Sequence, residues 1–461
     1  MKKLLLLAST VAMGVVPMFG QVQPSHDPAT YAPADGYTMT NRWIISQMTV
    51  GPDAMNVAPF SSNNARTATI LNGEVYVAET NADLNGVLHR FDFASGASKG
   101  SLNLTINGEP LNGTLCANNV GVDDYGHLYV CGFRADLNKG SLQVYLVNPE
   151  NGELTALPEI SPLDAGESAS AAAVRVDYID VIGDLTGTEC SGTVMAACNT
   201  DNLAVLRAVR EQGTDEFVGG FDGFFFWDAT AITETCPMIT DTDAGKVSPQ
   251  ASWGTAPMVK MINDEEHLGE SFYVDGFTTA PAIYNTQGTL TDSFNSCISL
   301  APVVGTNGIA EFSLGDDNFA VWSVCQYDKT PGCTASVGTF GQGFDFADLK
   351  VLYTFPEAGL GNQSDGGTRA HCLMTKKYVD ENNKEAVYIL DYKCRNGLGV
   401  YVFAQEGFVD PNPSQGGVDG IEDDVNAPAV YFNLQGQKID NPAAGLYIVK
   451  RGDKVTKELV K

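Results

Sequence analysis

Residues 74–96 read EVYVAETNADLNGVLHRFDFASG and carry the pattern that decides the fold. Two apolar runs, at 74–77 and 86–91, flank a polar loop, and the second run ends in a turn rich in Asp, Ser and Gly. Short runs of Val, Tyr, Phe and Leu separated by Asn, Asp and Gly are typical of β-strands joined in hairpins. The stretch therefore predicts a β-hairpin followed by a further strand.

The same two-strand unit recurs along the chain with different residues. The other first strands lie at 127–130, 193–196, 271–274, 318–321 and 386–389, and their partners lie at 141–145, 203–206, 281–284, 349–353 and 399–403. Repeated sheet units form a stacked array or a closed ring, and closure into a ring removes exposed strand edges. We therefore expect an all-β, six-bladed β-propeller.

The expected propeller spans residues 49–408. Seven blades are the alternative, because the 78-residue step from Ala196 to Val274 has room for another blade. Residues 41–45 precede the first unit and should either join the last blade, which closes the ring, or cover its edge.

The start of the chain has the pattern of an export signal. Lys2 and Lys3 precede an apolar run that continues to Val16, and small or polar residues follow from Gly20. This arrangement predicts a signal peptide over residues 1–20 and an N-terminal lead segment over residues 21–48. No later apolar run reaches the eighteen residues that indicate a membrane-spanning helix, so we expect no transmembrane segment.

The charge balance excludes one class of partner. The chain has 27 Lys and Arg against 56 Asp and Glu, which gives a formal net charge of −29. Such a chain is repelled by nucleic acid phosphates, so we expect no nucleic-acid partner.

Ten cysteines in an exported chain favour disulfides over metal sites. Two pairs lie symmetrically about the turn of a hairpin, which would place their Cβ atoms opposite each other, and a third pair brackets a turn. The expected pairs are Cys116 with Cys131, Cys372 with Cys394, and Cys325 with Cys333. The remaining four, Cys190, Cys198, Cys236 and Cys297, have three connectivities open to them.

The composition changes after residue 408. Residues 409–427 are rich in Asp, Gly, Pro and Asn, which predicts a flexible linker. The apolar pattern then returns in VYFNLQGQKI at 430–439 and GLYIVK at 445–450, before a closing lysine. These residues predict a small β-module over 428–461.

This tail resembles the C-terminal sorting module of type IX secretion in Bacteroidota. The resemblance implies that residues 428–461 bind the secretion machinery and direct the protein to the cell surface or the medium. The family module is usually longer, with an earlier pair of strands, so a periplasmic protein is the alternative. The repeats before the linker resemble secreted β-propellers of unknown function.

Residues with catalytic potential are few. The Gly-x-Ser-x-Gly match at 96–100 lies between two expected strands, whereas a nucleophile elbow needs a strand followed by a helix. His89 and His127 lie in expected strands and are interpreted as structural. The candidates for a catalytic site at the channel are His371, Arg369, Asp365 and Asp222.

Metal binding has one weak candidate. Asp241 and Asp243 alternate as carboxylates do in a calcium loop, but the third acidic position and the terminal Glu are missing. An acidic turn is the simpler interpretation. We expect no cofactor other than Ca²⁺ at this turn.

Two functions follow from these features. We expect a non-enzymatic binding or scaffold protein for an unknown extracellular ligand, either a glycan or a protein, held by loops on one face of the propeller. The alternative is a surface enzyme acting on polysaccharide, a lyase or a hydrolase, with its site at the channel. Fold alone does not distinguish the two.

Overall fold

The computed structural model describes most of the chain between residues 31 and 460. The described residues are 31–50, 58–134, 140–161, 175–198, 203–227, 237–241, 246–249, 257–262, 271–276, 279–285, 290–293, 306–324, 332–343, 345–362, 371–410, 430–432, 438–439, 445–451 and 454–460. The chain divides into two compact units, residues 1–414 and 415–461. The division lies within the expected linker.

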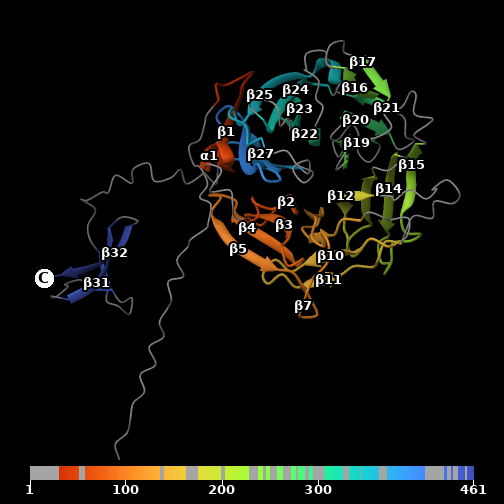
Figure 1. Cartoon of the computed structure of the whole chain (residues 1–461). Helices are drawn as coiled ribbons and strands as arrows, with labels where there is room; N and C mark the ends of the chain where they lie inside the picture. Colours follow the sequence, from red (N-terminus) through yellow and green to blue (C-terminus); the bar gives the residue numbers. More distant parts are fainter. Residues whose placement is uncertain are drawn as a thin grey trace, which may run out of the picture. The chain divides into compact units, whose positions relative to one another are not determined.

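The first unit is a six-bladed β-propeller (Figure 1), as the repeats predict. Each blade is an antiparallel four-stranded meander, and successive blades follow one another around the ring. In order from the inner to the outer strand, blade 1 is β2 (Ala65–Leu71), β3 (Glu74–Thr80), β4 (Gly86–Asp92) and β5 (Ser98–Asn103); blade 2 is β8 (Asn119–Val122), β9 (Leu128–Cys131), β10 (Val144–Val147) and β11 (Leu154–Ala156); blade 3 is β12 (Val176–Gly183), β13 (Gly192–Cys198), β14 (Leu203–Arg210) and β15 (Asp222–Trp227).

The second half of the ring has the same order. Blade 4 is β18 (Met258–Met261), β19 (Ser271–Gly276), β20 (Thr279–Asn285) and β21 (Leu290–Ser293); blade 5 is β22 (Thr306–Leu314), β23 (Asp317–Val324), β24 (Thr334–Gly341) and β25 (Lys350–Phe355); blade 6 is β26 (His371–Val379), β27 (Glu385–Lys393), β28 (Gly397–Gln405) and β1 (Tyr37–Ser46). A single residue pair, Gly276 with Thr306, links blades 4 and 5.

A few elements stand outside the blades. Two strand pairs, β6 (Thr105–Ile106) with β7 (Glu109–Pro110) and β16 (Pro237–Asp241) with β17 (Lys246–Pro249), extend the connections between blades. The second pair occupies the long step in which a seventh blade had room. Helix is limited, in the described part of the chain, to α1 (Gln47–Val50) and one 3₁₀ turn (Phe346–Asp348). None of the described helices has the length and apolar character needed to cross a membrane.

The N-terminal strand closes the ring. β1 pairs with β28 over nine residue pairs, from Tyr37 with Gln405 to Ser46 with Gly397. The two strands approach closely at their end, where a Cβ on Gly397 would lie 2.4 Å from the Ile45 carbonyl oxygen and the backbone φ is +150°. The propeller therefore begins at Tyr37, which corrects the expected boundary at residue 49.

Six clusters of buried apolar side chains fill the spaces between neighbouring blades, one cluster at each junction. Trp43 and Tyr388 of blade 6, for example, pack with Val77 and Phe91 of blade 1. Each large side chain buried in this way contributes about 1.5–3 kcal/mol. Each blade thus has both of its faces covered. The junction between blades 6 and 1 exists only because the first and last strands of the propeller pair in blade 6.

The two ends of the channel differ in the length of their loops. The inner strands β2, β8, β12, β18, β22 and β26 all begin at one end, here called the loop end. In sequence the connections between blades span 47–64, 104–118, 157–175, 228–257, 294–305 and 356–370, and the described strand ends that flank them lie at the loop end. The opposite end, here called the turn end, has mostly short turns within blades, such as 72–73 and 315–316. Connections of this kind can change in length without disturbing the blades.

The second unit contains four strands in the order β30 (Lys438–Ile439), β29 (Val430–Phe432), β31 (Gly445–Arg451) and β32 (Lys454–Val460). All of its strand pairs are antiparallel.

Closure can be tested at Trp43, which is fully buried and donates a hydrogen bond from Nε1 to the Phe93 carbonyl oxygen at 2.9 Å. We expect Trp43→Ala to lower the free energy of unfolding by about 3–5 kcal/mol, because it opens a cavity in the closing junction. Urea unfolding measures the effect. Met48→Ala, at an exposed position two residues beyond β1, is the control and should change it little. Equal effects of the two substitutions would contradict the closing role of β1.

Candidate functional site

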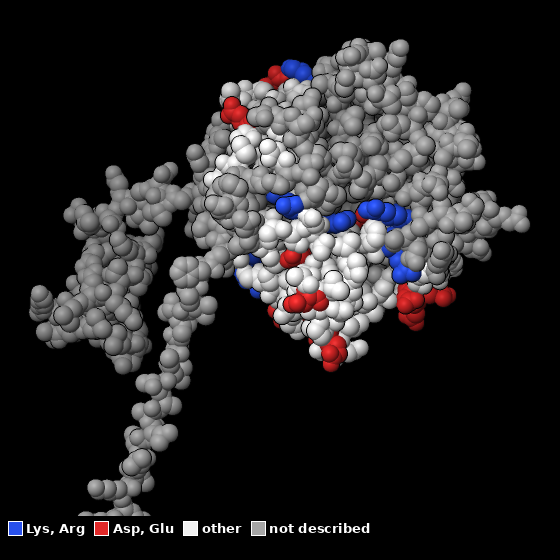
Figure 2. Space-filling view, in the orientation of Figure 1, with Lys and Arg blue, Asp and Glu red and all other residues white. Residues whose placement is uncertain are grey.

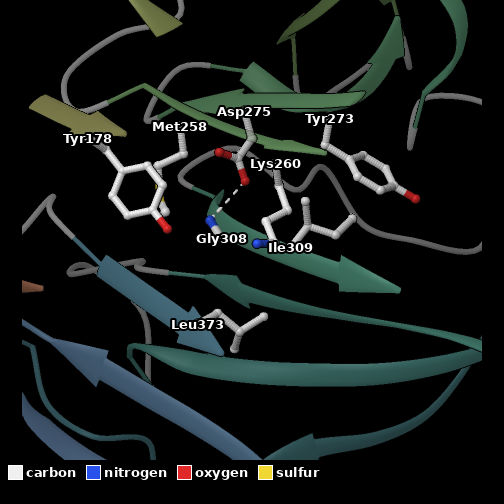
Figure 3. Close-up of a pocket in the computed structure, with 8 residues that line it drawn as sticks. All are labelled: Tyr178, Met258, Lys260, Tyr273, Asp275, Gly308, Ile309 and Leu373. Atoms are coloured by element: carbon white, nitrogen blue, oxygen red, sulfur yellow. Dashed lines mark hydrogen bonds between the residues drawn. The ribbon is translucent and has the colours of Figure 1, made fainter. Parts of the chain in front are cut away.

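A small pocket opens in the channel wall of blades 3 to 6 (Figure 3). Its volume is about 10 Å³, which is room for a single water-sized group. The inner strands β12, β18, β22 and β26 contribute most of the lining, because they lie side by side around the channel, and β19 contributes two residues. The lining residues are Tyr178, Met258, Lys260, Tyr273, Asp275, Gly308, Ile309 and Leu373.

Asp275 is the chemically unusual residue of this pocket. Its side chain is 1% exposed. Oδ2 accepts a hydrogen bond from the Gly308 backbone N–H at 2.8 Å, and Oδ1 has no hydrogen-bond partner among the described residues. Burial raises the pKa of this carboxyl to about 8, and the Gly308 N–H offsets only part of the shift. Asp275 is therefore mostly protonated at neutral pH, and its free oxygen is available to donate a hydrogen bond.

The positive group of the pocket is Lys260. Its Nζ lies 2.8 Å from Asp180 Oδ1, and Asp180 Oδ2 accepts the Met261 N–H at 3.0 Å. The Lys260 side chain is 45% exposed, so the ammonium group is accessible from solvent. Tyr178 lies on the same inner strand as Asp180, and in Figure 3 its hydroxyl points toward the space between Asp275 and Leu373.

Arginines gather around a neighbouring carboxylate on β12. Arg175 binds Asp177 through two hydrogen bonds, Nε to Oδ2 at 2.6 Å and Nη2 to Oδ1 at 2.7 Å. Arg66 of β2 approaches the same carboxylate, with Nη1 at 3.5 Å from Oδ1. Figure 2 shows Lys and Arg side chains in a band across the middle of the face in view, over the region of β2 and β12 in Figure 1. The centre of a strongly acidic protein is thus locally basic.

Two asparagines line the loop end of blade 2. Asn118 donates from Nδ2 to the Asp177 carbonyl oxygen at 2.8 Å, but its Oδ1 has no partner. Asn119 is 1% exposed, and within the described part of the chain neither its amide nitrogen nor its amide oxygen has a hydrogen-bond partner. Buried polar atoms rarely stay unsatisfied, so these groups are expected to bind water or a ligand.

A fully buried ion pair lies behind the pocket. Asp391 pairs with Leu373, a lining residue, across β27 and β26. The Asp391 carboxylate lies 2.9 Å from Lys393 Nζ, and both groups bind the Ser323 hydroxyl of blade 5. All three side chains have no exposed surface, so solvent does not reach them. The cluster joins blades 5 and 6 and supports the pocket wall.

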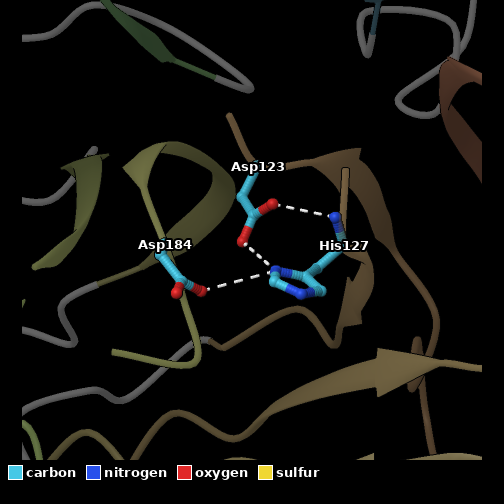
Figure 4. Close-up of side chains that lie close together, drawn as sticks. All are labelled: Asp123, His127 and Asp184. Carbon is cyan, nitrogen blue, oxygen red and sulfur yellow. Dashed lines mark hydrogen bonds and ion pairs between the residues drawn. The ribbon is translucent and has the colours of Figure 1, made fainter. Parts of the chain in front are cut away.

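A second polar cluster lies at the turn end and consists of Asp123, His127 and Asp184 (Figure 4). His127 Nδ1 lies 2.9 Å from Asp123 Oδ2 and 3.4 Å from Asp184 Oδ1. Each of the four carboxylate oxygens already accepts two hydrogen bonds, mostly from backbone N–H groups. No lone pair is left for a metal ion, so this cluster holds the turns of blades 2 and 3 together.

Asp184 shows the opposite pKa shift from Asp275. Burial alone would raise the pKa of Asp184, but hydrogen bonds from the Glu189, Thr186 and Thr188 N–H groups and the Thr186 hydroxyl outweigh it and lower the pKa to about 2. The interpretation of His127 as structural agrees with this network. His89 is likewise bound by Glu79 and Ser101.

The residues expected at a catalytic site are only partly placed. His371 begins β26, an inner strand, and its backbone pairs with Lys393, but its side chain lies outside the described part of the structure. Arg369 and Asp365 lie outside the described residues. Asp222 begins β15, the outermost strand of blade 3, and its side chain lies outside the described part of the structure, so its expected place at the channel stays a prediction.

Asp241 ends β16 and pairs with Lys246, and Asp243 lies outside the described residues. The expected Ca²⁺ site therefore stays a prediction.

The three expected disulfides have different outcomes in the structure. Cys131 pairs with Asn119, not with Cys116, because the β8–β9 hairpin turns about a later residue than expected, and Cys116 and Cys131 are both free thiols. Cys372 pairs with Tyr392, so it is not opposite Cys394 as expected, although its side chain is not described. Cys325 lies outside the described residues, and its pairing with Cys333 stays a prediction.

The sequence alone did not reveal Asp275, Lys260, Tyr178 or Asn119. Each lies inside or at the end of a short run of strand-forming residues, where a polar residue is common. Tyr273-Val274-Asp275-Gly276 and Val259-Lys260-Met261 are examples. The available signal was an acidic or basic residue within a short apolar strand. Their convergence depends on how the blades are placed around the ring.

The sequence matches no protein-family model and no curated protein. Solved structures with a similar arrangement include a polysaccharide lyase (9% identity, TM-score 0.37, 76% of this chain and 90% of that chain). AofleA from Arthrobotrys oligospora is 11% identical, with a TM-score of 0.38 over 73% of this chain and 82% of that chain. An endo-arabinase from Bacteroides thetaiotaomicron is 10% identical, with a TM-score of 0.29 over 77% and 97%. None of these likenesses extends to a ligand or an activity.

We expect Asp275→Asn to become more stable relative to wild type as the pH rises from about 4 to about 8. Unfolded aspartate has a pKa of about 3.9, so in this interval the native protein keeps a proton that the unfolded chain releases, and wild-type stability falls. Asparagine does not titrate and still accepts the Gly308 N–H. Thermal unfolding of both proteins at about pH 5 and about pH 8 measures the difference.

Asp184→Asn is the matched control. Its carboxylate is ionised in both the native and the unfolded states above about pH 5, so this variant should be less stable than wild type by the same amount at both pH values. If Asp275→Asn shows no gain with rising pH, Asp275 is ionised in the native protein.

Proposed function

We propose that this protein is an exported propeller that binds an extracellular ligand at the loop end of its channel. The observation that carries the proposal is the presence of buried polar groups without protein partners in the channel wall, the Asp275 Oδ1 atom and the Asn119 amide. Leaving such a group unsatisfied costs about 1–3 kcal/mol. Stability alone would favour apolar residues at these positions, so their presence favours a ligand.

The long connections support the same location. They gather at the loop end, where their sequences can vary while the blades stay intact. The Arg66, Arg175 and Lys260 side chains add charge at the same region of the wall. A ligand that covers the channel mouth would contact both the loops and these side chains.

Binding is favoured over catalysis by the state of the nearby carboxylates. A glycosidase normally uses two carboxyl groups, one as acid and one as base or nucleophile. Asp275 has the raised pKa of an acid, but Asp177 is occupied by two arginines and Asp180 by Lys260. No free second carboxylate lines the described part of this pocket.

A polysaccharide-active enzyme is the second candidate, and the protonated Asp275 is the observation that favours it. In that case Asp275 would give its proton to the leaving oxygen of a sugar chain. Incubation with soluble polysaccharides, followed by measurement of new chain ends, tests this. Cleavage that disappears in Asp275→Asn would establish the enzyme, and binding without cleavage would exclude it.

The binding function can be tested with Asn119→Leu, which keeps a similar volume and removes both hydrogen-bonding groups. We expect wild type to bind at least one member of a panel of soluble polysaccharides and extracellular proteins, and Asn119→Leu to bind it about tenfold or more weakly. Titration calorimetry measures both affinities.

The control variant is His127→Gln at the turn end, which should bind as wild type does. Unchanged thermal unfolding of Asn119→Leu shows that the loss is local. Failure of wild type to bind any member of the panel, or an equal loss in His127→Gln, would count against a ligand site at the loop end.

We also propose that residues 428–461 direct the protein through the type IX machinery to the cell surface. Support comes from the motifs at 430–439 and 445–450 and from the division of the chain at residue 414. Deletion of 428–461 should leave the unfolding temperature of the propeller unchanged and retain the protein in the periplasm. Cell fractionation and surface proteolysis measure its location. Normal surface levels of the truncated protein would refute a sorting role.

A further inference from the structure

The pocket at Asp275 presents hydrogen-bond donors. Asp275 Oδ2 accepts the Gly308 N–H, so the oxygen that faces no protein partner is Oδ1, which donates when the carboxyl is protonated. Lys260 has a donor ammonium and Tyr178 has a hydroxyl, and both line the same space. A ligand that binds the unpartnered Asp275 Oδ1 and approaches these two groups must offer acceptor oxygens.

The local charge favours an anion over a metal cation. Arg66, Arg175 and Lys260 give three positive charges, and Asp177 and Asp180 give two negative charges, so the net charge of this group is +1 while Asp275 is neutral. A cation in the pocket would lie beside the Lys260 ammonium. An anion would lie beside the Lys260 ammonium and the protonated Asp275, within a chain whose overall charge of −29 repels anions elsewhere.

The size of the pocket limits what enters it. A space of about 10 Å³ admits one small group, such as part of a carboxylate, and the rest of the ligand must lie in the channel mouth. The ring of Tyr178 is part of this wall and offers a flat surface of the kind that packs against a sugar ring. A carboxylate attached to a sugar ring can therefore reach the pocket while the ring packs against Tyr178.

We propose that Asp275, Lys260 and Tyr178 bind the carboxylate of an acidic sugar, a uronic acid unit of an extracellular glycan. This inference rests on the proposed binding function and names its ligand class. Asp275–H and the Lys260 ammonium each bind a carboxylate oxygen, and the sugar ring lies against Tyr178.

The proposal predicts how binding depends on pH. Ionisation of Asp275 as the pH rises through about 8 removes a donor and places a negative charge beside the ligand carboxylate, so affinity should fall. The charged and titratable groups around Asp275 are Lys260 on β18, Tyr178 on β12 and Tyr273 on its own strand. Among the described side chains of β22 and β26, Gly308, Ile309 and Leu373 line the pocket, and the Asp391–Lys393 pair lies behind Leu373.

The experiment compares oligogalacturonate with the same oligosaccharide after reduction of its carboxylates to hydroxymethyl groups. Titration calorimetry at about pH 6.5 should give an affinity about tenfold or more higher for the acidic form, because charge-assisted hydrogen bonds are lost on reduction. Lys260→Gln should bind the acidic form about tenfold more weakly, and the loss should be larger for the acidic form than for the neutral form.

Asp275→Asn is the decisive variant. Its amide nitrogen still donates to the ligand, while its oxygen accepts the Gly308 N–H, so it should bind the acidic form near neutral pH and keep that affinity at about pH 9, where wild type weakens. Asp275→Leu should lose binding at both pH values. A structural role alone would not separate the two substitutions in this way.

Four results would overturn the inference. Equal affinity for the acidic and reduced oligosaccharides would exclude carboxylate recognition, and an unchanged affinity in Lys260→Gln would exclude this pocket. Binding of polyglutamate as tight as that of oligogalacturonate would assign the site to acidic peptides. Binding of a neutral glycan or a protein with no preference for carboxylates would reject this ligand class and leave the binding function in place.

Discussion

The antiparallel pairing of β1 with β28 is the interaction on which the rest of the structure depends. A blade buries both of its faces only when it has a neighbour on each side, so an open array of six blades would expose two apolar faces. The nine residue pairs between Tyr37–Ser46 and Gly397–Gln405 tie the chain ends together and create the sixth junction. The position of every inner strand, and therefore of every side chain in the channel, follows from that closure.

Closure also explains why polar residues converge where they do. The six inner strands run in the same direction, so the first residues of all of them meet at one end of the channel. Arg66, Asn119, Tyr178 and Lys260 belong to four different blades, yet they line one wall region because their strands are neighbours. The apolar junctions fix this arrangement, and the ion pair of Asp391 with Lys393 supports it from behind. Apolar packing between the blades thus holds the polar side chains of the channel wall in place. The proposed binding site is therefore largely formed before a ligand binds.

Much of the fold could be predicted from the sequence. Strand pairs such as 74–77 with 86–91 are local, and their alternation and turns are visible in the residues, so six units and a six-bladed ring follow. The sequence also indicated that residues 41–45 either join the last blade or cover its edge, and the structure shows that they join it. The start of the propeller at Tyr37 could not be predicted, because the partner of β1 is more than 350 residues away in sequence.

The site could not be predicted in the same way. Asp275 is an ordinary strand-end aspartate in the sequence, and only its burial and its single hydrogen bond from Gly308 make it unusual. Asp222 was a candidate as an acid, and it begins an outer strand, because the sequence pattern does not distinguish inner from outer strands. The pairing of Cys116 with Cys131 failed by a small error in the hairpin register, because the turn at 123–127 is held by Asp123 hydrogen bonds that shift its centre.

The proposed anion-binding pocket depends most directly on the protonation of Asp275, because only a neutral carboxyl can donate a hydrogen bond to an anion. Infrared spectroscopy can detect the carbonyl band of a protonated carboxylic acid, and subtraction of the Asp275→Asn spectrum assigns the band to this residue. We predict a protonated Asp275 band at neutral pH that disappears as the pH rises through about 8. Absence of that band at neutral pH would show an ionised Asp275 and contradict the account.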